Sequence, residues 1–102
     1  MDAFSVLAEP RRRRVVEILA RRGQLNATQI CDEFDVTPQA ISQHLRALRE
    51  ANMIQMERKA QQRLYTLNPK SMHQVEAWAA DVVKLWNNRL DRLKKALEED
   101  AV

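Results

Sequence analysis

Residues 37–54, TPQAISQHLRALREANMI, contain the clearest helix start and the clearest periodicity in this chain of 102 residues. Thr37 is a good N-cap, and Pro38 suits the first helical position, where its missing N–H would have had no partner. Apolar side chains then recur at spacings of four and three, at Ile41, Leu45 and Leu48. This pattern predicts an amphipathic helix that buries one side.

A shorter helix is predicted immediately before this one, in NATQICDEF, residues 26–34. Asn26 can cap it, and Gln29, three residues later, can reach back to the cap as in a capping box. Ile30 and Phe34 would form its buried side. Because only the brief turn "DV" separates the two helices, residues 26–51 predict a helix-turn-helix.

The preceding residues, 1–22, are predicted to form N-terminal helices, with Pro10 in a first helical turn and Gly23, the only glycine, as a helix end. Four consecutive arginines, 11–14, lie within this region. Consecutive residues of a helix step by 100°, so the four side chains scatter over about 300° and cannot form one basic face. We expect them to lie mostly in solvent or to pair with acids such as Glu17.

Beyond residue 53 the hydrophobic period changes to two. Ile54 and Met56 alternate with polar residues, as do Tyr65 and Leu67, and a polar stretch separates the two pairs. The pattern predicts a two-stranded hairpin over residues 54–67. A helix-turn-helix followed by a hairpin is the order of a winged helix-turn-helix, a mainly α fold with a small β-hairpin.

A long helix is predicted over residues 71–99, with Ser71 as its cap and an apolar stripe along most of its length. The stripe is larger than one small domain covers comfortably, so we expect it to hold two chains together. The predicted dimerisation residues are Val75, Trp78, Ala79, Val82, Trp86, Leu90 and Leu93. The alternative is that the stripe folds back on its own domain.

The side of the 37–50 helix opposite its apolar stripe carries residues suited to reading base pairs. Glutamine can pair with adenine, arginine with guanine, and alanine can touch the thymine methyl group. The hairpin adds basic residues with almost no acid near its tip, which suits contact with phosphates. The predicted DNA contacts are Thr37, Gln39, Ala40, Ser42, Gln43, His44 and Arg46 in the helix and Arg58, Lys59 and Arg63 in the hairpin. The alternative is an ordinary solvated helix face.

The composition fits this interpretation. With 45% apolar and 30% charged residues, the chain is expected to form one folded domain, residues 1–102. A net charge of +3 is compatible with a polyanionic partner without demanding one. The sequence contains neither a membrane-spanning stretch nor a secretory signal, so we expect a cytoplasmic protein.

The sequence resembles the ArsR/SmtB (arsenic-repressor-like) family of transcriptional regulators. LAEPRRRRVVEIL, residues 7–19, and SQHLRALREANMI, residues 42–54, match its first-helix and recognition-helix signatures, and Tyr65 and Leu67 match its second wing strand. The resemblance implies a homodimer, joined through N- and C-terminal helices, that binds double-stranded DNA at an inverted repeat and represses transcription.

The chain departs from that family at two glycines of its pattern. Asn52 replaces the glycine after the recognition helix, which is a mild change because asparagine tolerates a left-handed conformation. Ala60 replaces the glycine of the wing turn, where alanine is strained by about 1–2 kcal/mol. We therefore expect a looser or differently shaped wing tip.

Metal sensing is not expected, although many members of the family release DNA on binding metal. Asn26 and Thr28 occupy the positions of the paired cysteines, and the lone Cys31 cannot build a zinc site, which needs about four ligands. The terminal helix offers His73, Glu76 and Asp81 without a second histidine at helical spacing. We predict no metal and no cofactor.

No catalytic constellation can be assembled from the sequence, so an enzyme is not predicted. Two other functions remain open: a metal- or redox-responsive repressor of the same family, and a winged-helix module that binds another protein.

Overall fold

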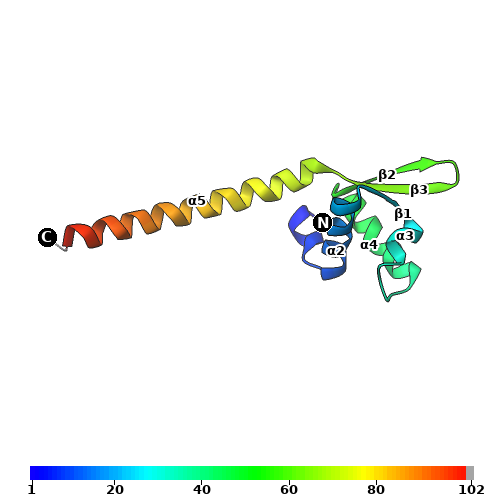
Figure 1. Ribbon diagram of the computed structural model, residues 1–102, viewed down its shortest axis with the longest axis horizontal. Helices are drawn as coiled ribbons and strands as arrows, with labels where there is room; N and C mark the ends of the chain where they lie inside the picture. Colours follow the sequence, from blue (N-terminus) through cyan, green and yellow to red (C-terminus); the bar gives the residue numbers. More distant parts are fainter. Residues whose placement is uncertain (101–102) are drawn as a thin grey trace. The chain divides into compact units, whose positions relative to one another are not determined.

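The computed structural model of the protein describes residues 1–100 (Figure 1). It comprises two compact units, Met1–Met72 and a second that begins at His73, and each is described by itself. The elements in chain order are α1 (Ala3–Leu7), α2 (Pro10–Arg22), β1 (Gln24–Asn26), α3 (Ala27–Cys31), α4 (Pro38–Glu50), β2 (Ile54–Lys59), β3 (Gln62–Leu67) and α5 (Pro69–Asp100).

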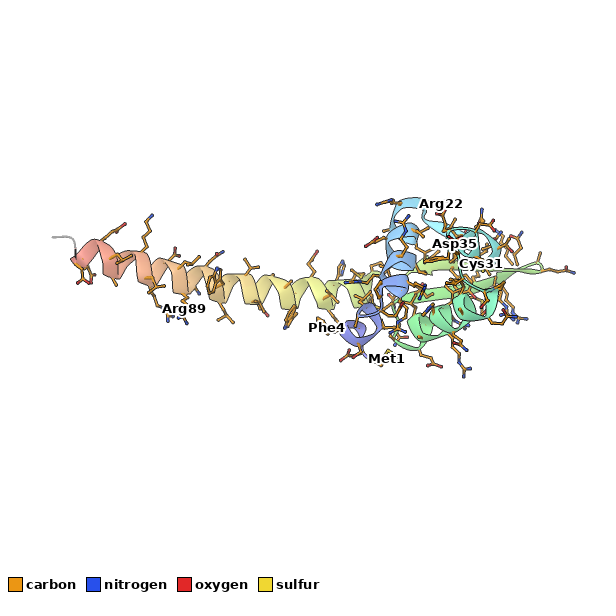
Figure 2. The ribbon with its side chains drawn as sticks, turned by 90° about the horizontal axis from the view of Figure 1, so that it is seen from below. Met1, Phe4, Arg22, Cys31, Asp35 and Arg89 are labelled. Carbon is orange, nitrogen blue, oxygen red and sulfur yellow. The ribbon has the colours of Figure 1, made fainter. Side chains whose placement is uncertain are left out.

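Helix α2 begins and ends where its sequence predicts. Pro10 is its first residue, and the Glu9 side chain caps it by accepting a hydrogen bond from the Arg12 backbone N–H at 2.9 Å. Gly23 closes it with a φ of 84°, a left-handed conformation that L-residues avoid. At this end Arg22, labelled in Figure 2, forms an ion pair with Glu33 at 3.1 Å.

The side chains in the run of four arginines have different partners, as expected. Arg12 is half-buried, and its Nε donates a 2.6 Å hydrogen bond to the carbonyl of Val6, which joins α2 to α1. Arg14 pairs with Glu17 at 3.9 Å, and Arg11 pairs with Glu9 at 3.8 Å. Because these side chains leave the helix in different directions, the run forms no single basic surface.

The caps of the helix-turn-helix are confirmed. In α3 the Asn26 side chain accepts from the Gln29 N–H and the Gln29 side chain accepts from the Asn26 N–H, both at 2.8 Å, which completes the capping box. In α4 the Thr37 hydroxyl oxygen accepts from the Ala40 N–H at 3.1 Å. Phe34 differs from expectation, because α3 ends at Cys31 and Phe34 lies half-buried beyond it.

The end of α4 is a Schellman motif centred on Asn52, whose φ is 59°. The Met53 N–H donates to the Leu48 carbonyl at 2.9 Å, and the Asn52 N–H donates to the Arg49 carbonyl at 3.0 Å. Met53 and Leu48, the two positions that are usually apolar in this motif, are both fully buried. Asparagine therefore serves in the place of glycine, as the sequence predicts.

The expectation that Ser71 caps the last helix is wrong. Helix α5 already begins at Pro69, and the Asn68 side chain accepts from the Lys70 N–H at 3.3 Å. Ser71 is buried, and its hydroxyl donates a 2.6 Å hydrogen bond to the Asn52 carbonyl. This serine therefore holds the first turn of α5 against the end of α4.

The sheet has three antiparallel strands in the order β1-β3-β2, not the two that the sequence predicts. The hairpin itself is confirmed, with Met56 opposite Tyr65 and Ile54 opposite Leu67. The additional strand, β1, pairs Leu25 with Tyr65 on the other edge of β3. Three residues are too short to show a period, so this strand is defined by its partner and not by its own sequence.

The wing turn is tight, so of the expected looser or differently shaped tip the looser one is wrong. Strand pairing continues to Lys59 and Gln62, which leaves only Ala60 and Gln61 in the turn. Ala60 takes a left-handed conformation, with a φ of 57°. Figure 1 shows the hairpin extending beyond the helices of this unit.

Side chains from the helices and the sheet form the core of the first unit. The predicted stripe of α4 is buried, with Ile41, Leu45 and Leu48 at most 3% exposed. Val6 of α1, Leu19 of α2 and Ile30 of α3 are fully buried as well. The buried side of α4 is thereby fixed, and its opposite side is left exposed.

In the second unit α5 continues as one helix to Asp100 (Figure 1). Large apolar side chains that the sequence places on one side of it are 43–57% exposed: Trp78, Val82, Trp86, Leu90 and Leu93. Ala79 is also exposed, and Val75 is half-buried. None of the helices in residues 1–100 combines the length and hydrophobicity of a membrane span.

Candidate nucleic-acid interface

The exposed side of α4 presents four of the predicted contact residues together. Gln39, Ser42, Gln43 and Arg46 are all exposed; Gln39, Gln43 and Arg46 lie opposite the buried stripe, and Ser42 lies on its flank. The Arg46 side chain is 81% exposed. These amides, hydroxyl and guanidinium are the groups that distinguish base pairs in the major groove.

Two further residues lie at the start of α4. Ala40 is half-buried, so only part of its methyl group is accessible. The exposed Thr37 hydroxyl oxygen accepts from the Ala40 N–H at 3.1 Å. Its own O–H remains able to donate, so Thr37 can cap the helix and contact a phosphate at the same time.

His44 does not join this exposed set. Its side chain is only 17% exposed, and its Nδ1 lies 3.8 Å from Oε2 of Glu9. Burial tends to raise the pKa of the Glu9 carboxyl, but the Arg12 N–H hydrogen bond and the charge of His44 hold that pKa below its usual value. His44 therefore joins α4 to the start of α2.

A groove between α4 and β3 brings the helix and the wing together. It is lined by Ser42, Arg46 and Arg49 from α4 and by Arg63 from β3, and Leu45 and Tyr65 contribute to the same surface. Three guanidinium groups around one groove can hold a phosphate between the two elements. The sequence reasoning missed Arg49, although its spacing of three from Arg46 places it on the same side of α4.

The wing places two arginines directly opposite each other. Arg58 of β2 pairs with Arg63 of β3, so both side chains project from the same face of the hairpin. Both are exposed, and within residues 1–100 neither takes part in an ion pair. Like charges in opposite positions destabilise a sheet, and an anion bound between them would relieve the repulsion. Lys59, next to the turn, is exposed too.

The possible sensor residues are dispersed. Cys31, labelled in Figure 2, is the half-buried last residue of α3, and its thiol is free. Asn26 and Thr28 are near in sequence, and Asn26 is occupied in the capping box. Across the part of the chain that the structure describes, no group of three or more His, Cys, Asp or Glu residues could hold a metal ion.

Comparisons with known proteins find similar sequences and structures. Residues 9–56 match the sequence model of the arsR family of bacterial regulatory proteins. The transcriptional repressor SdpR of Bacillus subtilis is 28% identical over 89 residues, which are 87% of this chain and 98% of SdpR. The arsenical resistance operon repressor of Escherichia coli is 30% identical over 83 residues, 81% of this chain and 68% of that protein.

The fold is similar to solved structures as well. The crystal structure of a possible transcriptional regulator for arsenical resistance superposes with a TM-score of 0.74 at 35% identity. The superposition covers 91% of this chain and 93% of the other.

Proposed function

Because the chain belongs to the arsR family of bacterial regulatory proteins and is a DNA-binding transcriptional regulator, we propose that it is a cytoplasmic, dimeric repressor that reads an inverted repeat without sensing a metal. In this proposal α4 enters the major groove and the β2–β3 wing contacts the backbone beside it. The whole chain acts as one domain of this dimer, and it carries out no catalysis.

The observation that carries the proposal is the basic groove between α4 and the wing. Arg46 and Arg49 from the helix and Arg63 from the wing surround it, next to exposed Gln39 and Gln43. Arginine binds phosphates or pairs with guanine, and glutamine pairs with adenine, so one surface combines both parts of sequence-specific recognition. Arg58, opposite Arg63, extends the positive charge along the wing.

The exposed apolar residues of α5 support the dimer. Trp86 is 57% exposed and Leu93 is 53% exposed, and water is an unfavourable neighbour for side chains of this size. A clustered apolar surface of this kind marks an interaction site. A second copy of α5 offers the same apolar stripe in return, and a two-fold dimer would present two copies of α4 about 34–36 Å apart, one turn of the double helix.

Metal independence is proposed from the residues at the usual sensor positions. Asn26 and Thr28 stand in place of cysteines, so Cys31 is the one thiolate that this region offers. A zinc centre needs about four ligands. A metal-responsive repressor is the second candidate, because relatives such as the arsenical resistance operon repressor of Escherichia coli are named as regulators of arsenic resistance. Chelator-sensitive release of DNA and stoichiometric zinc in purified protein would favour it.

The test is a binding selection from random duplexes at physiological salt, combined with light scattering of the protein and of its complex. We expect an inverted repeat to be enriched, two chains to bind one duplex, and affinity to fall steeply as salt rises. A stable monomer that enriches no sequence and binds another protein would favour the winged-helix interaction module instead.

A further inference from the structure

The last residue of α4, Glu50, is an acid on the side of the helix that is proposed to face DNA. Its Oε1 accepts a 3.1 Å hydrogen bond from Nε of Arg46. Both side chains are exposed, Arg46 by 81% and Glu50 by 65%. Glu50 also lines a surface groove with Arg46 and Arg49. A carboxylate here would repel the phosphates that the neighbouring arginines attract.

Helix stability does not explain the Arg46–Glu50 pair. The acid follows the base by four residues, which is the less favourable order for a helical ion pair. Glu50 also stands at the C-terminal end of α4, where the helix dipole carries partial negative charge and an acid is unfavourable. Because exposed ion pairs contribute little, the two effects together leave almost no net stabilisation.

The hydrogen bond from Arg46 to Glu50 determines which N–H donors of Arg46 can bind DNA. An arginine side chain has five N–H donors in a fixed plane, and the hydrogen bond to Glu50 occupies the one on Nε. The four donors on the two terminal nitrogens remain for another partner. Two of these donors in parallel match the two acceptors of guanine, O6 and N7, in the major groove.

We propose that Glu50 is a positioning residue that orients Arg46 toward a base and disfavours DNA of other sequences. This inference rests on the proposed function of the α4 surface. Glu50 repels the backbone of any duplex, and only a correctly placed base uses the oriented guanidinium of Arg46. The acid thus lowers total affinity and raises the ratio of specific to non-specific binding.

The test compares Glu50→Ala and Glu50→Gln with Glu57→Gln as a matched control. Glu57 is an exposed acid on β2, so its substitution removes one negative charge from the same unit without touching Arg46. Affinities are measured for the DNA selected by the wild-type protein and for a scrambled duplex, at several salt concentrations. Thermal unfolding is measured in parallel.

Glu50→Ala should bind the scrambled duplex more tightly than wild type and lower the specific-to-non-specific ratio roughly fivefold, the lower end of what one base contact contributes. Glu50→Gln keeps an acceptor for Nε, so it should retain the wild-type ratio, as should Glu57→Gln. In an Arg46→Ala background the effect of Glu50→Ala on the ratio should disappear. None of the Glu50 variants should unfold at a lower temperature than wild type.

The inference is overturned if Glu50→Ala retains the wild-type ratio, or if its loss of preference persists when Arg46 is already alanine. Lower thermal stability of Glu50→Ala would assign the pair a structural role instead. If the wild-type protein itself prefers no sequence, the proposed function fails, and that result is distinct from a wild-type preference that Glu50→Ala leaves unchanged.

Discussion

Substitution of Ala60 by glycine should stabilise the protein. Ala60 holds a φ of 57° in the two-residue turn of the wing, and a left-handed conformation costs an L-residue roughly 1–2 kcal/mol. Glycine avoids this strain but has more conformational freedom in the unfolded chain, which costs about 0.4–1 kcal/mol. The difference predicts a gain of about 0.5–1 kcal/mol in the free energy of unfolding.

Gln61 supplies a matched control in the same turn. Its φ is not positive, so Gln61→Gly relieves no strain and should lose about 0.4–1 kcal/mol through the unfolded chain alone. Urea unfolding of the full chain, at one protein concentration for all variants, measures both changes. Hydrogen exchange at Gln62 reports whether the tip itself becomes more protected. Destabilisation by Ala60→Gly, or equal effects of the two substitutions, would refute the reasoning.

Three further perturbations test other parts of the structure. Glu9→Ala removes the cap of α2 and should cost about 1 kcal/mol near neutral pH. The pKa of Glu9 is lowered in the folded protein, so its ionised carboxylate stabilises the fold at pH values above the ordinary glutamate pKa. The difference in unfolding temperature between Glu9→Ala and wild type should therefore shrink as the pH falls through the lowered pKa. Arg63→Ala should weaken binding to all DNA sequences alike and reduce the slope of log affinity against log salt by about one, measured by fluorescence anisotropy; a loss confined to one sequence would contradict a phosphate contact. Trp86→Ala should raise the dimer dissociation constant by about 30-fold, a typical loss for a buried interface tryptophan, whereas Lys84→Ala on the other side of α5 should leave it unchanged in sedimentation experiments.

The features that the sequence predicts correctly are local ones. The Asn26–Gln29 capping box and the Thr37 cap each involve residues three apart, so the signal and the structure occupy the same few positions. The buried stripe of α4 is also predictable because helical geometry fixes which residues share a side. Its exposed side, which forms the candidate interface, follows directly from that stripe.

The features that the sequence missed depend on residues far apart in the chain. β1 is a strand because Leu25 pairs with Tyr65, forty positions away, and Ser71 is not a cap because its hydroxyl reaches the Asn52 carbonyl. His44 pairs with Glu9, the cap of α2, thirty-five positions away. Such contacts leave no mark on local periodicity, so only the folded chain reveals them.

The most direct test of sequence reading by α4 is the affinity of Gln43→Ala for the selected DNA and for single-base variants of it, measured beside wild type. Gln43 is exposed, so its substitution should leave the fold intact. We predict a loss of about 1–3 kcal/mol on the selected DNA, with discrimination abolished at one position of each half-site and retained elsewhere. Wild-type affinity and preference in Gln43→Ala would contradict the assignment of α4 as the element that reads DNA.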